Sequence, residues 1–325
     1  MSSVSSTRRL ALAVDIGGTK VEAALVDDEA HVVAGSRQRA ETGRGSSSAM
    51  IAEAVGQVAE RALATAPADG EVLGAGIGSA GPISLENGTV SPLNLPAWRG
   101  FPLARLVEER TGLTETVLRL DGLCILLAEY WAGSLAGART AMGMVVSTGI
   151  GGGLIVEGRL VGGRTGNAGH VGQILLPDTD AAGREFASTL EDIASGPHIV
   201  EWARRQGWNG TTGEDLAADY DRRDRIAVAA VHRCARALGA GIASVCALLD
   251  LEAVAIGGGF ARVAPDLLDL VRSAVDEAAP LETIRGVRVL RAALGDDGPL
   301  IGAAGLIHRG DLLPDDRREP ARLPR

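Results

Sequence analysis

Near the amino end of the chain, a short polar turn separates two apolar runs, residues 10–14 and residues 21–26. The turn reads Asp15-Ile16-Gly17-Gly18-Thr19-Lys20. Two strands joined in this way present backbone N–H groups and a hydroxyl to an anion, because glycine tolerates positive φ and has no Cβ in the way. Lys20 is also the only lysine in the chain. We therefore predict a phosphate-binding hairpin, although an exposed lysine at a strand end would fit the same residues.

The same layout of apolar run and glycine turn occurs twice more. Residues 142–146 and 154–156 flank a turn with the sequence Ser147-Thr148-Gly149-Ile150-Gly151-Gly152-Gly153, and residues 253–256 lead into Gly257-Gly258-Gly259. One glycine-rich turn is a weak signal, because hairpins need glycine in any case. Three of them favour a bound nucleotide, and neither the Walker nor the Rossmann pattern fits better. Glycines that serve only as turns in a sugar- or peptide-binding protein remain the alternative.

Two other strand ends carry residues that could contact a ligand. The apolar run 72–78 leads to Gly81, and the run 116–120 ends at Asp121, directly before a helix. Ligands bind at the carboxyl ends of strands in open α/β sheets. Asp121 is therefore either a catalytic carboxylate or an N-cap of the helix that follows.

The composition indicates a globular protein with two lobes. The chain has 325 residues, of which 46% are hydrophobic and 22% charged, and its formal net charge is −9. This charge and the lack of a basic run argue against a nucleic-acid partner. The three cysteines lack disulfide or metal spacing, which favours a cytoplasmic protein. We find no apolar stretch in the sequence that is long and charge-free enough to span a bilayer, so we expect no membrane partner.

The order of the expected elements repeats along the chain. Hairpin strands at 10–14, 21–26 and 30–34 precede alternating helices and strands, and a similar series begins near residue 142. We expect an α/β fold with a smaller lobe of residues 1–120, completed by 309–325, and a larger lobe of residues 121–308. The active-site cleft would lie between the two lobes.

Seven motifs in this order make the chain resemble the ROK family, which comprises repressors, open reading frames and sugar kinases of the actin-like ATPase superfamily. The motifs are Asp15 to Lys20, Gly76-Ile77-Gly78 with Gly81-Pro82, Asn94-Leu95-Pro96 with Trp98, Ser147 to Gly153, Gly166-Asn167-Ala168-Gly169, Leu190-Glu191 with Ala194 to Pro197, and Gly257 to Gly259. The resemblance covers residues 10–308 and implies a two-lobed actin-like (ribonuclease H-like) fold with duplicated mixed sheets. Repressors of the family carry a helix-turn-helix domain before the first hairpin. Nine residues precede it here, so we expect no DNA-binding role.

The resemblance also implies ATP and Mg²⁺ as cofactors and assigns roles to the glycine turns. Asp15, Gly17, Gly18, Thr19 and Lys20 would face the β- and γ-phosphates, with Asp15 toward Mg²⁺. Thr148, Gly149 and Gly151 would bind the other phosphates, and Gly257, Gly258 and Gly259 would border adenosine. Asp121 would be the general base, which suits phosphoryl transfer because the acceptor hydroxyl must lose its proton. The family further implies a homodimer.

The residues expected to bind the acceptor depart from the family pattern. Leu120 stands where family sugar kinases have Asn, and His170 and Gln173 stand where they have Glu and His. Asn94 and Glu191 retain the sugar-binding residue types. Residues 178–189 contain no cysteine, so we expect no structural zinc site. The predicted substrate-binding residues are Gly81, Asn94, Leu120, Asp121, His170, Gln173 and Glu191.

These departures favour a kinase whose acceptor is not ordinary glucose. A C7-cyclitol or a modified sugar of secondary metabolism, as in antibiotic biosynthesis, would suit a pocket that has lost polar contacts, because lost contacts relax the rejection of analogues. Two alternatives stay open. One is a non-catalytic ligand-binding protein or pseudokinase that retains bound ATP, and the other is an ordinary glucokinase.

Overall fold

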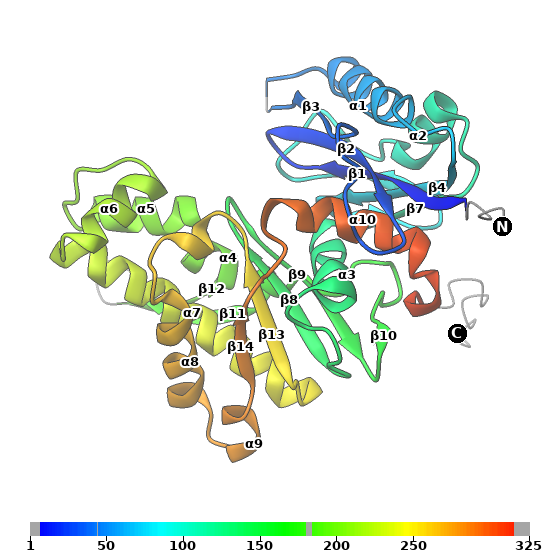
Figure 1. The fold of residues 1–325 in the computed structure, drawn as a ribbon. Helices are drawn as coiled ribbons and strands as arrows, with labels where there is room; N and C mark the ends of the chain where they lie inside the picture. The colour runs from blue at the N-terminus through cyan, green and yellow to red at the C-terminus, as the bar shows by residue number, and fades with distance from the viewer. Residues whose placement is uncertain (1–6, 44, 180–183, 315–325) are drawn as a thin grey trace, which may run out of the picture. The chain divides into compact units, whose positions relative to one another are not determined.

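The computed structural model describes residues 7–43, 45–179 and 184–314. Contacts divide the chain into two units. Unit 1 contains Met1–Leu120, Ile155–Ala168 and Pro299–Arg325, and unit 2 contains Asp121–Leu154 and Gly169–Gly298. Two five-stranded mixed sheets with flanking helices confirm the predicted α/β class (Figure 1).

Unit 1 is built on a sheet with the strand order β3-β2-β1-β4-β7. β1 pairs antiparallel with β2 and parallel with β4, β2 pairs antiparallel with β3, and β4 pairs parallel with β7. Its elements are β1 (Arg8–Ile16), β2 (Lys20–Asp27), β3 (Gln38–Glu41), α1 (Ser48–Leu63), β4 (Gly70–Ser79), β5 (Ile83–Ser84), β6 (Thr89–Val90), α2 (Leu103–Thr111), β7 (Thr116–Leu120), β10 (Arg159–Leu160), α10 (Gly298–His308) and the 3₁₀ turn η4 (Gly310–Leu312).

Helices cover both faces of this sheet, which explains why residues 10–14 of β1 and most residues of β2 are apolar on both faces. In Figure 1, α1 and α2 lie on one face and α10 lies on the other. The α10 backbone comes very close to β4, since a Cβ on Gly76 would lie 1.7 Å from the carbonyl oxygen of Ala303. We expected residues 299–308 in the second lobe, but this approach places them in unit 1.

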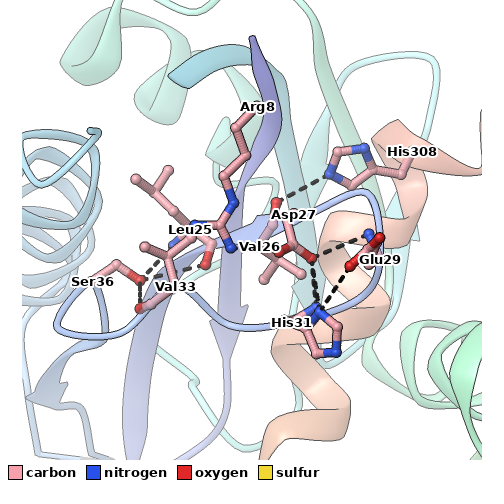
Figure 2. Close-up of polar contacts among 9 residues, drawn as sticks. All are labelled: Arg8, Leu25, Val26, Asp27, Glu29, His31, Val33, Ser36 and His308. Atoms are coloured by element: carbon pink, nitrogen blue, oxygen red, sulfur yellow. Dashed lines mark hydrogen bonds and ion pairs between the residues drawn. The ribbon is translucent and has the colours of Figure 1, made fainter. Parts of the chain in front are cut away.

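The expected strand at 30–34 is wrong, because Asp27 ends β2 in a tight turn. The Asp27 carboxylate accepts the N–H groups of Glu29 and His31 at 3.1 and 2.8 Å, and Arg8 donates to its other oxygen (Figure 2). Ala30 takes a positive φ of 67°. The chain then makes only an isolated bridge to β2, and the third strand of the sheet is β3.

The second sheet has the order β10-β9-β8-β13-β14, in which β13 is parallel to both neighbours. Contacts assign β10 and the end of β9 to unit 1 and the remainder to unit 2. The other elements are α3 (Asp121–Ala132), β8 (Ala141–Val146), β9 (Ile150–Val156), η1 (Val171–Gln173), β11 (Leu175–Thr179), β12 (Glu185–Thr189), α4 (Leu190–Ala194), α5 (Gly196–Arg205), α6 (Gly213–Asp221), α7 (Arg225–Leu249), β13 (Ala253–Gly257), η2 (Phe260–Arg262), α8 (Leu267–Ala278), α9 (Glu282–Arg285), β14 (Arg288–Arg291) and η3 (Gly295–Asp297).

The long helix α7 forms much of the core of unit 2. A Cβ on its Gly239 would lie 2.5 Å from the Cβ of Ala274, so α7 and α8 pack closely. Contrary to our expectation, α7 is long and apolar enough to cross a membrane by length and composition, and among the described residues it is the one such helix. Most of its apolar residues are buried inside the unit, as in the core helix of a globular protein.

Candidate active site

The β1–β2 turn of unit 1 is held in a defined conformation from two directions. The N–H of Gly17 donates to the carbonyl of Lys20 at 2.9 Å and closes the turn. Thr42, just after β3, donates its N–H to the carbonyl of Thr19 and its hydroxyl to that of Gly17. Thr19 itself is exposed, and Asp15 is half-buried at the end of β1. These hydrogen bonds fix the conformation of the turn that we predicted to bind phosphate.

Lys20 has a partner that the sequence analysis did not single out. Its Nζ atom lies 2.6 Å from Oε2 of Glu22, a buried carboxylate. The two residues are two apart on β2, so they lie on the same face of the strand. That spacing is the signal that could have identified Glu22. The ion pair holds the ammonium group at the start of β2, beside the turn.

Asn94 lies directly against the same turn. A Cβ on Gly18 would be 2.6 Å from Nδ2 of Asn94, so only glycine fits there without displacing the amide. The Oδ1 atom of Asn94 is buried and has no hydrogen-bond partner among the described residues. Buried side-chain oxygens are nearly always paired. This oxygen is therefore an unsatisfied hydrogen-bond acceptor beside the turn.

Three strands of unit 1 end at the same edge of the sheet. Ile16 of β1 is in register with Ser79 of β4, and Ser79 is in register with Leu120 of β7. Gly81 follows β4 and is half-buried, whereas Leu120 is buried. The structure thus brings the ends of β1, β4 and β7 to one edge, and ligands of open α/β sheets bind at the carboxyl ends of strands.

In unit 2, Asp121 is the first residue of α3, and its carboxylate is half-buried. Burial raises the pKa of this carboxyl above its ordinary value, although the N–H of Gly122, 2.7 Å from Oδ1, and the positive charge of His170 both oppose the increase. A raised pKa brings a carboxylate closer to the range in which a general base works best near neutral pH. The hydrogen bond to Gly122 also shows that Asp121 satisfies one N–H at the start of the helix.

Glycines let α3 approach β8 and β9 closely. A Cβ on Gly122 would lie 2.6 Å from the backbone nitrogen of Gly152, and one on Gly153 would lie 2.7 Å from Cα of Leu123. The second glycine turn is therefore next to the start of the helix. A Cβ on Gly151 would be 4.0 Å from Oδ1 of Asp121.

Glu191 supports this second turn from α4. Its Oε2 atom accepts the N–H of Ile150 at 2.7 Å and would lie 2.6 Å from a Cβ on Gly149. Thr148, at the tip of the turn, is exposed. We predicted Glu191 as a contact of the acceptor. The structure shows that one of its oxygens binds the backbone of the predicted phosphate-binding turn.

The third glycine turn lies beside the second. Gly258 has a φ of 96°, and a Cβ there would be 2.4 Å from the carbonyl oxygen of Val146, so this position requires glycine. A Cβ on Gly259 would be 3.7 Å from Oγ of Ser147. The N–H of Gly196, at the start of α5, donates to the carbonyl of Ser147 at 2.9 Å. Two glycine turns and a helix N-terminus thus meet around Ser147.

His170 and Gln173 lie at the ends of a short segment that includes η1. Both side chains are exposed, and the N–H of Gln173 donates to the carbonyl of His170 at 2.9 Å. The charge of His170 lowers the pKa of Asp121, so the imidazole acts electrostatically on the predicted base. Among the described residues, no group of three or more His, Cys, Asp and Glu side chains is arranged to hold a metal ion.

Comparisons with known proteins agree with the motifs. The family model described as ROK family matches residues 11–310. A glucokinase from Streptomyces coelicolor is 29% identical over 94% of this chain and 99% of its own. An N-acetylmannosamine kinase from Escherichia coli is 32% identical over 93% of this chain and 99% of its own. A crystal structure of a ROK family glucokinase from Streptomyces griseus in complex with glucose and AMPPNP has a TM-score of 0.78 and 29% identity, covering 93% of this chain and all of that one.

Proposed function

This chain belongs to the ROK family, and from that premise we propose that it is an ATP-dependent sugar kinase with Asp121 as its general base. The family relatives named above include kinases of glucose and of N-acetylmannosamine, which supports phosphoryl transfer to the hydroxyl of a sugar. The observation that carries the proposal is the position of Asp121, whose carboxylate has a raised pKa and lies beside the glycine turn at Gly151.

The reaction that we propose depends on positioning and charge more than on covalent help from the protein. Asp121 would accept a hydrogen bond from the acceptor hydroxyl and take its proton as the hydroxyl oxygen attacks the γ-phosphorus. The bond from that phosphorus to the bridging oxygen of the β-phosphate would break in the same step, and ADP would leave. The backbone N–H groups of the glycine turns would hold the phosphates, and the ammonium of Lys20 would neutralise part of their charge. Gly257 to Gly259 would border the adenosine.

Mg²⁺ fits the residues at the first turn. Asp15 supplies one half-buried carboxylate at the end of β1, next to a turn suited to phosphate. Mg²⁺ is typically bound by one or two carboxylates together with substrate phosphates and water. When bound, the ion would neutralise charge on the phosphate oxygens. Asp15 would hold it, and Lys20 is kept beside the turn by Glu22.

For the acceptor, we propose a sugar or sugar-like molecule whose contacts differ from those of ordinary glucose. The unpaired Oδ1 of Asn94 supports a hydroxyl-bearing ligand. Leu120 is buried and apolar at a strand end, which removes a polar contact there. His170 offers an imidazole close enough to act on Asp121. A C7-cyclitol or a modified sugar is the acceptor class that we favour.

The structure has three buried thiols that form no disulfide, those of Cys124, Cys234 and Cys246. Free thiols are typical of proteins in a reducing compartment, so we propose a cytoplasmic enzyme. The homodimer stays a prediction.

The proposal is tested by incubating the protein with Mg-ATP and a panel of acceptors while ADP release is followed. The panel contains glucose, N-acetylmannosamine, N-acetylglucosamine, amino sugars and C7-cyclitols. We expect turnover with at least one acceptor and a weaker kcat/KM for glucose than for the best acceptor. Tight AMPPNP binding without turnover on any acceptor would favour a non-catalytic binder. The highest kcat/KM on glucose would favour an ordinary glucokinase.

A further inference from the structure

Glu129 of α3 is a buried carboxylate that the proposed chemistry does not use. It is 1% exposed. Four neutral groups donate hydrogen bonds to it. Two of the donors come from Ser134, just after the end of α3: its N–H and its hydroxyl donate to Oε2 at 2.8 and 2.9 Å. A Cβ on Gly133 would lie 2.2 Å from the same oxygen, so the neighbouring glycine leaves room for the carboxylate. Burying a carboxylate is costly unless its oxygens are paired, and here both are.

The other two donors come from a distant part of the chain. The N–H groups of Ala293 and Leu294 donate to Oε2 and Oε1, each at 3.0 Å. These residues follow β14 and precede η3. Glu129 therefore connects α3 to the loop at residues 292–294, about 165 residues further along the chain.

That loop also contacts the third glycine turn. The N–H of Ala292 donates to the carbonyl of Ile256 at 3.0 Å, and a Cβ on Gly257 would lie 3.0 Å from the Cβ of Ala292. A continuous path of hydrogen bonds and contacts thus leads from Gly257, through Ala292 and Leu294, to Glu129. Asp121 begins the same helix that carries Glu129.

We propose that Glu129 is a positioning residue that couples the nucleotide-side loop at Gly257–Gly259 to the placement of α3, and so of Asp121. This inference rests on the proposed function, because it takes the glycine turn as the adenosine border and Asp121 as the base. A nucleotide that orders the turn at Gly257–Gly259 also orders the loop at residues 292–294. The N–H groups of Ala293 and Leu294 then hold the carboxylate of Glu129 in one position. The rotation of α3 about its axis is set in the same step.

The substitution Glu129→Gln tests this coupling at a single bond. The glutamine amide oxygen can replace Oε2, where three donors converge, but its NH₂ group then faces the N–H of Leu294. The hydrogen bond to Leu294 is lost and the shape is kept. The matched control is Asp27→Asn in unit 1. Asp27 is also buried and also accepts two backbone N–H groups, but it has no contact with this path (Figure 2).

The measurement is hydrogen exchange of the full chain with and without Mg-AMPPNP. In the unsubstituted protein we expect the nucleotide to slow exchange both in peptides spanning 257–262 and in peptides from the start of α3. In Glu129→Gln, the slowing at 257–262 should persist, while that at α3 should fall at least about fivefold, the effect of one buried hydrogen bond. Asp27→Asn should keep both responses even if its stability falls.

The outcomes separate this inference from the proposed function. If AMPPNP changes exchange nowhere in the unsubstituted protein, nucleotide binding fails and the inference fails with it. If Mg-AMPPNP slows exchange at residues 257–262 and slows exchange at the start of α3 equally with and without the substitution, the inference alone is overturned. Should Glu129→Gln not fold, Ser134→Ala removes one donor to Oε2 and should reduce the α3 response about twofold. An undiminished response there overturns the coupling.

Discussion

Asp121 is placed where its ionised form is unfavourable for folding but would serve the proposed reaction. Its half-buried carboxylate loses hydration, and this burial is the main reason for its raised pKa. One N–H, that of Gly122, and the charge of His170 recover part of the loss. A base that must accept a proton benefits from this environment, whereas the folded state is destabilised by it. Function and stability should therefore respond in opposite directions to substitution of this residue.

We expect Asp121→Asn to lower kcat by about 10²–10⁴-fold, the usual contribution of a general base, without loss of stability. The folded pKa lies above the unfolded value of about 3.8, so the free energy of unfolding falls as the pH rises from the unfolded pKa to the folded pKa, and the full cost of ionising Asp121 is present above it. Asn removes this cost. The melting temperature at pH 8 should be equal or higher, and the difference should narrow as the pH falls toward 4. Turnover and thermal melts measure both, and full activity in the variant would exclude Asp121 as the base.

His170 should determine the acid limb of the pH profile. Its positive charge lowers the pKa of Asp121, so removing it should raise that pKa further. Because the base works only when ionised, kcat/KM in His170→Ala should begin to fall at a higher pH than in the unsubstituted protein. The profile is measured on the best acceptor of the panel. An acid limb at the same pH in both proteins would mean that His170 does not act on the base.

Residue type and order were sufficient to predict that Asp121, the glycine turns and Lys20 lie at strand ends, because each is adjacent to a clear apolar run, and their roles stay predictions. The partners of these residues were harder to predict. Glu22 is local and could be found from the alternation of β2, but Glu129 meets Leu294 only after the chain has folded. Long-range hydrogen bonds of this kind leave no periodic trace in a single sequence.

At the scale of elements, the glycine turns of unit 2 are shaped by what packs behind them. α3 touches β8 and β9 through glycines, and α4 supplies the carboxylate of Glu191 to the N–H of Ile150. A charge-assisted hydrogen bond to a backbone N–H is among the stronger ones in proteins. The role that we assign to Glu191 is therefore support of the turn at Gly149, in addition to the contact with acceptor predicted from the family.

Substitutions of Glu191 should separate these two roles. In Glu191→Ala the N–H of Ile150 loses its partner, so we expect the dissociation constant for Mg-AMPPNP to rise about 10-fold or more. Glu191→Gln keeps an acceptor oxygen at the same place and should stay close to the unsubstituted value. Isothermal titration of both variants gives the comparison. A change confined to the KM of the acceptor would instead support a purely sugar-binding role.

Elements were predicted well where their signal is local and poorly where a tertiary contact decides. The apolar residues 30–34 look like a strand, but Asp27 binds the N–H groups of Glu29 and His31 and closes a turn first. α10 follows the second sheet in sequence, yet Gly76 leaves space for its backbone on β4. In the first case the side chain of Asp27, which lies outside the apolar segment, prevents a strand. In the second case the lack of a side chain at Gly76 lets α10 pack on β4.

At the scale of the whole molecule, the two sheets share one plan. In each, the central strand, β1 or β8, lies between the strand that follows it in the chain and a parallel strand from later in the chain. Each sheet carries a glycine turn after its central strand, and the proposed function gives both turns a phosphate. The two turns differ in charge. The first turn carries Lys20, the only lysine of a chain with 32 basic residues and a net charge of −9.

This single lysine allows an amine reagent to modify one side chain in the entire protein. Acetylation of Lys20 would remove the ammonium that binds Glu22 at 2.6 Å and that we assign to the phosphates. We expect Mg-AMPPNP to slow acetylation, as followed by mass spectrometry, and the acetylated protein to bind AMPPNP about 10-fold more weakly or worse. A Lys20→Arg variant, which can be acetylated only at its α-amino group, controls for that second amine and should bind AMPPNP equally before and after treatment. Unchanged affinity after complete acetylation of Lys20 would remove the lysine from the nucleotide site, and with it the argument that the first turn binds phosphate through charge.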